Sequence, residues 1–458
     1  MPFLSYKRAV QLRQVLKDTQ AIVVTPEDEG YPELISRWSE ACEKEAGAVV
    51  MATSSHEVAL TVTFATVHYI PFVVQGGGYS TSGASSTHGG IVINLSAMRG
   101  ATWAEVDQAA EREGLAVVGC TTSAAGVGGT TLGGGFGWLT GRHGLVIDNL
   151  ISVRMVLSDG RVVNASVAEH PDLFWAVRGA GQSFGVATEF VLRAHRQRSP
   201  IFGGLLYLPI DQLNAVVKFA NQFDEKATGD EGLFFGFTTR PPALLSTVIV
   251  ALLFYNGPRA AAEAFFAPLL ALGPIQNETH EMPYPEMNTI LGQLAAPGAR
   301  KRMSGTTISL PLEPQIVLEI YEDFDRIMQS YPRVEGSVVA FELLPYARVI
   351  QVPVGATAYA NRGPYHNVAT VFRWHDPELD AKITSLDRAL VRKIRERAGV
   401  AGVAGHGVGL YANYAGHEAN AQELFGDNLP RLQDLKKHYD PKNMFQKWHN
   451  LLIPTSPV

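Results

Sequence analysis

A glycine-rich stretch constrains this sequence more than any other feature. Residues 126–137 read GVGGTTLGGGFG, and seven of these twelve residues are glycine. Glycine loses more backbone freedom on folding than any other residue, so this density needs a reason. The usual reason is a main chain that presses against a ligand or adopts positive φ, and we expect a large, flat, anionic ligand. A flexible linker is the alternative, but the residues that follow are apolar and strand-like.

Two further glycine turns flank this stretch. QGGGYS, residues 75–80, follows an apolar strand at 70–74, and RGAGQSFGV occupies 178–186. The order of strand, helix, strand and glycine turn is typical of α/β units, which bind ligands at such turns. The intervening helix begins with the capping-box spacing of Ser54 and Glu57. No Gly-Lys-Ser/Thr follows any glycine run, which excludes a P-loop, and the Rossmann register G-x-G-x-x-G fits poorly.

The composition shifts near Ser199 and Pro200. We expect a hairpin around Ser158, Asp159 and Gly160 before this point. Beyond it the pattern predicts one sheet covered by helices on one side. The predicted strands are 248–255, 338–343 and 368–374, and the predicted helices begin at Pro258 and span 314–330, 377–397 and 429–438.

Composition excludes several classes of protein. The chain has 458 residues, 46% of them hydrophobic, which suggests two or three domains. A net charge of -6 without a basic cluster predicts no nucleic-acid partner, and the apolar runs are too short to span a membrane. The first residues carry no signal-peptide pattern, so we expect a cytoplasmic protein. Cys42 and Cys120, the two cysteines, imply neither a disulfide framework nor a metal site.

The motifs, taken together, resemble a known family. They are QGGGYS, GVGGTTLGGGFG, HGLVIDNL, HPDLFWAVRGAGQSFGVAT, and YDPKNMF with a later Asn. In this order they resemble the berberine-bridge-enzyme-like FAD-linked oxidoreductases, which have the PCMH-type (vanillyl-alcohol-oxidase) FAD-binding fold. The resemblance covers nearly the whole chain. It implies an α+β protein with a two-lobed FAD domain at 1–198 and an antiparallel-sheet substrate domain with helices on one face at 199–408. Residues 409–458 would return to the FAD domain.

The resemblance also assigns the cofactor. Glycine turns let main-chain N–H groups approach a pyrophosphate without a Cβ between them. Residues 75–80 would cradle the pyrophosphate and line the flavin edge, 126–137 would run along pyrophosphate and isoalloxazine, and 181–186 would close the adenine end. The predicted FAD-binding residues are Gln75, Gly76, Gly77, Gly78, Tyr79, Ser80, Thr122, Gly126, Gly128, Gly129, Leu132, Gly133, Gly134, Gly135, Gly137, Gly185, Val186 and Asn450.

Four departures from the family pattern matter. Tyr79 occupies the position of a His that bonds covalently to the flavin, and Thr122 that of a second, Cys tether. We therefore predict dissociable FAD with a lower redox potential, and interpret nearby Cys120 as a packed thiol. Roughly fifteen residues, the size of two short strands, are missing between Met98 and Trp103. Of the family's terminal N-x-N only Asn450 remains.

The chemistry needs a hydride acceptor, flavin N5, and a base for a proton. In the family a Tyr-x-Asn-Tyr loop lies beside the flavin, so Tyr411 and Tyr414 are the candidate bases, with lowered pKa, and Asn413 holds the loop. The alternative is that both tyrosines are packed aromatics. Arg362 matches a loop near the pocket or is a solvated charge.

Three histidines remain. His143 and His170 are interpreted as structural. His88 stands close enough to the Tyr79 turn to approach the flavin, although a structural role is the simpler interpretation.

The leading hypothesis is an FAD-dependent oxidoreductase of secondary metabolism. It would act on a small, largely apolar or aromatic molecule and pass electrons to molecular oxygen. A redox-neutral isomerase or cyclase that uses the flavin pocket is the second hypothesis, because such work needs no tether. A truncated, inactive homologue is the third, because of the missing strand pair.

Overall fold

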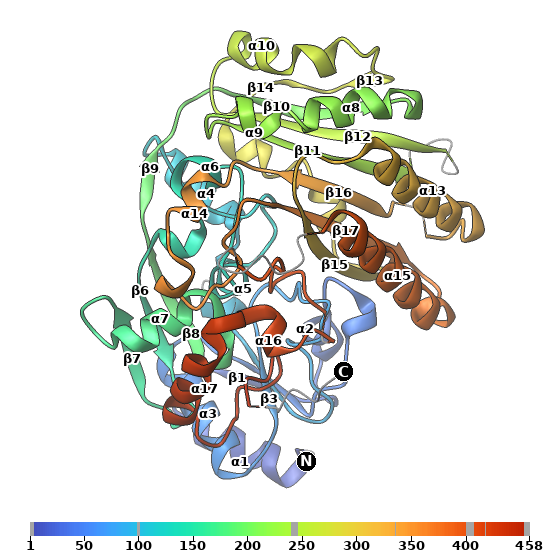
Figure 1. The fold of residues 1–458 in the computed structure, drawn as a ribbon. Helices are drawn as coiled ribbons and strands as arrows, with labels where there is room; N and C mark the ends of the chain where they lie inside the picture. The colour runs from blue at the N-terminus through green and yellow to red at the C-terminus, as the bar shows by residue number, and fades with distance from the viewer. Residues whose placement is uncertain are drawn as a thin grey trace.

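The structure is a computed structural model that describes residues 4–98, 101–239, 246–334, 336–399, 407–416 and 418–452. In Figure 1 the blue N-terminal ribbon and the red C-terminal helices lie together in the lower half, and the green-to-brown middle of the chain forms most of the upper half, with part of the teal ribbon beside it. Among the described residues, no helix combines the length and the apolar character needed to cross a membrane.

The first lobe is a four-stranded sheet in the order β1-β2-β4-β3. β2 (Ala48–Met51), β4 (Ile91–Asn94) and β3 (Phe72–Gln75) run parallel, and β1 (Ile22–Val24) is antiparallel to β2. The crossover helix α3 (Ser55–Val67) begins with the predicted capping box, in which the Ser54 hydroxyl accepts from the Glu57 N–H. Because β3 ends at Gln75, its carboxyl end delivers the chain directly into the first glycine turn.

The second lobe contains a three-stranded antiparallel sheet in the order β7-β6-β8. Its strands are β6 (Leu150–Val156), β7 (Val162–Ser166) and β8 (Val186–Leu192). The predicted hairpin is confirmed, and Gly160 takes φ +83° in its turn. A two-stranded sheet of β5 (Leu115–Val117) and β9 (Ala194–Arg196) leads toward the upper half.

The short connection after Met98 passes straight into a helix. Residues 99 and 100 lie outside the described part of the chain, and α4 (Trp103–Glu111) begins with its own capping box of Thr102 and Glu105. Trp103 is fully buried, in a space that the missing side chain of Gly119 leaves open. The described residues of this connection contain no strand pair.

The upper half is one antiparallel sheet in the order β13-β10-β12-β11-β16-β17-β15, with β14 also paired to β10. Its strands are β10 (Ile201–Leu208), β11 (Glu231–Thr239), β12 (Thr247–Tyr255), β13 (Gln276–Asn277), β14 (His280–Met282), β15 (Arg300–Ile308), β16 (Val338–Leu343) and β17 (His366–Trp374). The predicted strands β12, β16 and β17 are confirmed. The other strands, β10, β11, β13, β14 and β15, were not predicted. In β15 the sequence RKRMSGTTI is charged and lacks an apolar alternation.

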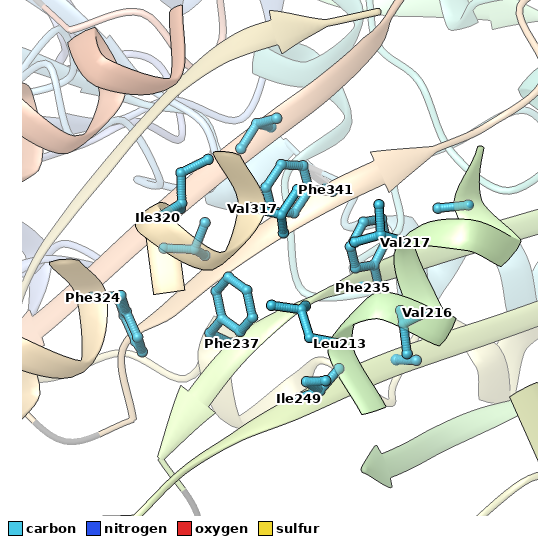
Figure 2. Close-up of a cluster of buried hydrophobic side chains, with 14 of the residues drawn as sticks. Leu213, Val216, Val217, Phe235, Phe237, Ile249, Val317, Ile320, Phe324 and Phe341 are labelled. Carbon is cyan, nitrogen blue, oxygen red and sulfur yellow. The ribbon is translucent and has the colours of Figure 1, made fainter. Parts of the chain in front are cut away.

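Helices cover one face of this sheet, as the sequence predicted (Figure 1). They are α8 (Leu213–Ala220), α10 (Arg259–Leu270), α13 (Pro314–Ser330) and α15 (Asp380–Ala398). Figure 2 shows Phe235, Phe237 and Phe341 of the sheet meeting Leu213 of α8 and Phe324 of α13. Burying each such side chain contributes roughly 1.5–3 kcal/mol to the free energy of folding. This face of the sheet therefore forms the hydrophobic core of the upper half. The opposite face is left to meet the lower half of the molecule.

The C-terminal segment packs into the lower half. α16 (Ala421–Phe425) and α17 (Leu429–Tyr439) bury Leu424 and Leu432 in the same cluster as Phe174 of α7 (Pro171–Ala180). The remaining helices are α1 (Tyr6–Leu16), α2 (Tyr31–Ile35), α5 (Val127–Leu132), α6 (Thr140–His143), α9 (Phe223–Lys226), α11 (Tyr284–Met287), α12 (Gly292–Ala295) and α14 (Ala347–Ile350).

Candidate active site

A cavity of about 1240 Å³ lies between the helix-free face of the large sheet and the glycine turns. Pockets for small molecules usually measure roughly 300–1,000 Å³, so this one has room for a large cofactor together with a substrate. The strand residues of the large sheet that line it are Gly204, Leu205, Tyr207, Phe234, Phe235, Thr238, Thr239, Val250, Leu252, His280, Met303, Val338, Ala340, Glu342, Ala369, Val371 and Arg373.

The first two glycine turns meet at this cavity, main chain against main chain. A Cβ on Gly77 would lie 2.8 Å from the Gly126 nitrogen, and a Cβ on Gly126 would lie 2.8 Å from the Gly77 nitrogen. Glycine is therefore required on both sides of this contact. Gly76 and Gly129 also line the cavity, but a Cβ on either would meet no protein atom within 4 Å. That open space beside bare main chain is what a pyrophosphate cradle requires.

Twelve of the predicted FAD-binding residues line the cavity: Gly76, Gly77, Gly78, Tyr79, Ser80, Thr122, Gly126, Gly128, Gly129, Leu132, Gly185 and Val186. Six lie outside the lining: Gln75, Gly133, Gly134, Gly135, Gly137 and Asn450.

The glycines at 133–137 have a reason other than the expected ligand. Protein atoms occupy the place of every missing Cβ: Asn413 at Gly133, Tyr359 at Gly134, Val146 at Gly135 and the Gly119 main chain at Gly137. This half of the stretch is dense in glycine because protein packs closely on protein.

Gln75 and Asn450 do not line the cavity but make hydrogen bonds within the protein next to it. The Gln75 side-chain oxygen accepts a hydrogen bond from Asn94 at 3.3 Å, at the end of the parallel strands. Asn450 accepts from Asn443 and from the Leu452 N–H, both at 3.1 Å, and so stabilises the C-terminal turn.

Two further polar groups of the lining, Ser85 and Lys447, suit an anionic dinucleotide. Ser85 lines the cavity, and its buried hydroxyl has no hydrogen-bond partner among the described residues. Lys447 lines it from the C-terminal segment, and burial together with neighbouring Lys44 lowers the pKa of its amine. The Lys447 amine and free main-chain groups suit a pyrophosphate. Lys447 lies in none of the motifs that predicted FAD-binding residues.

The two tether positions carry groups unsuited to a flavin bond. The Tyr79 hydroxyl donates to the Ala295 carbonyl at 2.9 Å, and its ring stacks on Trp38 with centroids 5.8 Å apart. Cys120 and Thr122 both line the cavity. Burial raises the pKa of the Cys120 thiol to about 11, so at neutral pH it is protonated and a poor nucleophile.

The loop at 411–414 lines the cavity and contacts the glycine stretch. The Asn413 amide donates to the Tyr411 hydroxyl at 2.7 Å and to the Thr130 carbonyl at 3.2 Å. Both hydrogen bonds are consistent with the predicted role of Asn413 in holding the loop. The Tyr411 and Tyr414 rings lie edge to face with centroids 4.9 Å apart.

A buried carboxyl group that was not among the predicted site residues accompanies this loop. The Tyr414 hydroxyl donates to Glu342 Oε1 at 3.0 Å, with Oε2 at 3.2 Å, and Glu342 lines the cavity from β16. Burial raises the pKa of Glu342 to about 8, an effect that the Tyr414 hydrogen bond opposes. Burial also raises the pKa of both phenols far above their usual value, the opposite of the lowered pKa expected for a tyrosine base. The carboxyl is therefore the group that titrates near neutral pH.

A signal for Glu342 was present in the sequence. It is the one acidic residue in the otherwise apolar strand VVAFEL. A charged residue in a strand buried on both faces is costly unless it has a function or a partner.

Arg362 lies outside the cavity lining. It is buried and forms an ion pair with Asp148, at 2.6 Å, so it is not a solvated charge.

None of the three histidines lines the cavity. His143 stacks on His195 with centroids 3.7 Å apart, His170 precedes α7 with φ +47°, and His88 is exposed.

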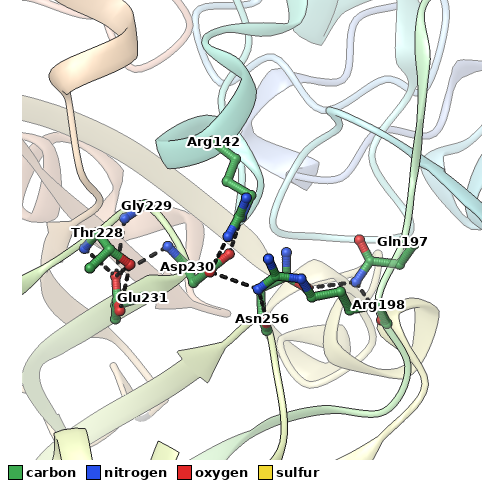
Figure 3. Close-up of polar contacts among 8 residues, drawn as sticks. All are labelled: Arg142, Gln197, Arg198, Thr228, Gly229, Asp230, Glu231 and Asn256. Carbon is green, nitrogen blue, oxygen red and sulfur yellow. Dashed lines mark hydrogen bonds and ion pairs between the residues drawn. The ribbon is translucent and has the colours of Figure 1, made fainter. Parts of the chain in front are cut away.

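A polar junction joins the two halves that enclose the cavity (Figure 3). Arg142 of α6 forms a two-pronged ion pair with Asp230, the residue before β11. Arg198 donates to the same carboxylate at 2.9 Å. The neighbouring Glu231 carboxylate accepts the N–H groups of Thr228, Gly229 and Asp230 at 2.7–3.1 Å. These bonds fix the sheet wall relative to the glycine turns.

Two glycine substitutions separate ligand contact from protein packing. Gly76→Ala should leave the free protein as stable as wild type but weaken FAD binding about ten- to a hundredfold, because its Cβ enters ligand space. Gly77→Ala should destabilise the free protein by about 1–3 kcal/mol through the contact with Gly126. Thermal unfolding and FAD titration measure both, with Gly355→Ala as the control in open space outside the cavity. Equal FAD affinity of the Gly76 and Gly355 variants would contradict the cradle.

Comparison with known proteins agrees with this geometry. A family profile described as FAD binding domain matches residues 46–166, and one described as Berberine and berberine like matches 410–451. The chain is 34% identical to FAD-linked oxidoreductase pgmH of Aspergillus terreus, over 96% of this chain and 94% of that protein.

Solved structures share the fold at lower identity. Physcomitrella patens BBE-like 1 superposes with TM-score 0.82 and 20% identity, over 98% of this chain and 100% of that one. A variant of berberine bridge enzyme in complex with (S)-reticuline superposes with TM-score 0.81 and 16% identity, over 100% of both chains. With its two-lobed glycine-turn half and its one-sided antiparallel sheet, the chain belongs to the berberine-bridge-enzyme-like FAD-linked oxidoreductases of the PCMH-type fold.

Proposed function

We propose that this oxidoreductase oxidises a small, largely apolar or aromatic molecule of secondary metabolism and passes the electrons to molecular oxygen. One observation carries the proposal. The buried pair of Glu342 and Tyr414 lies in the same cavity as the open glycine positions Gly76 and Gly129. A proton acceptor and a cofactor cradle thus share one space, as removal of a hydride and a proton from neighbouring atoms requires.

The protein's part in this chemistry is binding and proton transfer. FAD, when bound, would supply the hydride acceptor. Glu342 takes the substrate proton on its carboxylate, and the Tyr414 hydroxyl donates to the charged form of that carboxylate and so favours it before the transfer. Asn413 holds Tyr411 against α5, which keeps the loop in place. Tyr411 and Tyr414 thus remain site residues, while the proton goes to the carboxyl group.

The walls support an apolar substrate. Phe234, Val250, Leu252, Ala340 and Ala369 line the sheet side of the cavity and offer neither donors nor acceptors from their side chains. An aromatic or conjugated molecule gains from contact with these five side chains, whereas a sugar hydroxyl placed against them would have no partner there.

The flavin should be dissociable, because Tyr79 is fixed to Ala295 and the Cys120 thiol is protonated. Acid precipitation of the purified yellow protein is expected to leave a colourless pellet and release FAD into the supernatant, measured by absorbance and by mass spectrometry of the protein. A pellet that stays yellow, or a protein mass raised by that of FAD, would refute non-covalent binding.

Anaerobic mixing with candidate substrates tests the reaction class. Bleaching of the flavin absorbance, followed by recovery and oxygen uptake when air is admitted, is the expected result. Product formation without bleaching would instead favour the isomerase or cyclase, since Glu342 provides acid–base chemistry without electron transfer. Purified protein that takes up no FAD would favour the inactive homologue.

A further inference from the structure

Two cations lie on neighbouring strands of the large sheet, at the end of β17 that is remote from Glu342. Lys301 of β15 and Arg373 of β17 are paired in register. The Lys301 amine donates to the carbonyls of Trp38, Ala296 and Gly298 at 2.9, 2.6 and 2.5 Å, which uses all three of its N–H groups. Lys301 therefore has a structural task, joining the sheet to the loop that carries Trp38.

Arg373 has no such task. It lines the cavity, and within the described ranges its guanidinium makes no hydrogen bond and no ion pair. A guanidinium carries five N–H donors in a planar fork that matches a carboxylate. This half-buried cation is thus equipped for a partner that the described protein does not supply.

The wall between Arg373 and Glu342 is apolar and made of small residues. The cavity-facing pairs are Ala340 with Ala369 and Val338 with Val371. Glu342 pairs with Asn367, six residues before Arg373, which corresponds to roughly 20 Å of strand. Along this part of the cavity, β16 and β17 therefore present Glu342 at one end and Arg373 at the other. The lining side chains between them on these two strands are apolar.

We propose that the substrate bound in this cavity is an elongated, mainly apolar molecule with a carboxylate at one end. Arg373 binds this carboxylate while the other end of the molecule reacts at Glu342 and Tyr414. The inference rests on the proposed function, because it uses Glu342 as the reacting end. A two-pronged hydrogen bond from arginine fixes both the position and the direction of the ligand. Arg373 is in this way a specificity-determining residue.

Calorimetric titration of the holoenzyme tests this with cinnamate, 5-phenylpenta-2,4-dienoate and the methyl ester of each. Charge-assisted hydrogen bonds predict that each acid binds about ten- to a hundredfold more tightly than its ester. Arg373→Gln should bring acid and ester to equal affinity, and Arg373→Lys should keep part of the difference. Arg326→Gln, which removes an exposed arginine on α13, is the matched control and should keep the full difference.

The assignment is overturned if acid and ester bind alike to the wild-type holoenzyme, if no acid binds, or if Arg373→Gln keeps the preference. Flavin bleaching is read separately. A holoenzyme that is bleached by a substrate but does not distinguish acid from ester keeps the proposed function and loses the role of Arg373.

Discussion

Replacing Glu342 with glutamine should lower kcat by about 10²- to 10⁴-fold while FAD remains bound. Glutamine keeps the shape of the side chain and can still accept the Tyr414 hydrogen bond, but it cannot take up a proton. Rapid-mixing measurement of flavin reduction isolates this step from the reaction with oxygen. An unchanged flavin spectrum in the variant would show that the cavity has kept its shape. Full activity of this variant would remove Glu342 from the mechanism.

The pH dependence provides an independent check of the same group. As a base, Glu342 must be ionised, so kcat/KM should rise with pH through an apparent pKa of about 8. The Tyr414 hydrogen bond lowers the pKa of Glu342, so Tyr414→Phe should move this rise to higher pH. Tyr346→Phe is the matched control, because Tyr346 donates to Asp224 at 3.0 Å outside the cavity and should leave the profile unchanged. Equal profiles for the two variants would contradict the pairing.

Replacing Lys436 with methionine should lower the free energy of unfolding by about 3–5 kcal/mol. The Lys436 amine is fully buried and donates to the Ser183 carbonyl at 2.6 Å and to Asp440 and the Phe445 carbonyl at 2.7 Å. Asp440 in turn accepts the Phe445 N–H at 2.8 Å. Methionine fills the space but leaves the Asp440 carboxylate buried without its cation, which costs far more than the loss of an exposed pair.

The same substitution should weaken FAD binding, because Lys436 and Asp440 both bond the main chain of Phe445, and Phe445, Lys447 and Trp448 line the cavity. Lys437→Met is the matched control, since Lys437 is the next residue, is 65% exposed and pairs with Asp434 only at the surface. That variant should stay within about 0.5 kcal/mol of wild type. Denaturant unfolding of both variants, with and without FAD, gives the comparison. If the two variants are equally stable, Lys436 does not hold the C-terminal segment.

Local patterns in the sequence were enough for much of the fold. The capping box of Ser54 and Glu57 marks the start of α3, and the apolar period of α13 marks its buried face. Such signals depend on residues three or four apart, whose interaction the chain itself determines. β15 escaped prediction because its buried Arg302 is compensated by Asp387, 85 residues away. No local pattern reports a partner at that distance.

The sequence by itself determined that three glycine turns follow their secondary-structure elements and that the chain carries the motifs of an FAD-linked oxidoreductase. Only the tertiary structure decided which glycines face the cavity, as Gly76 does, and which are packed against protein, as Gly134 is. It also decided that Glu342 meets Tyr414, and that Arg373 is unpartnered among the described residues while Lys301 is saturated. The physical reason is that a backbone preference is a property of a few neighbouring residues. The protonation and the hydrogen bonding of a side chain depend instead on groups that folding brings from distant parts of the chain.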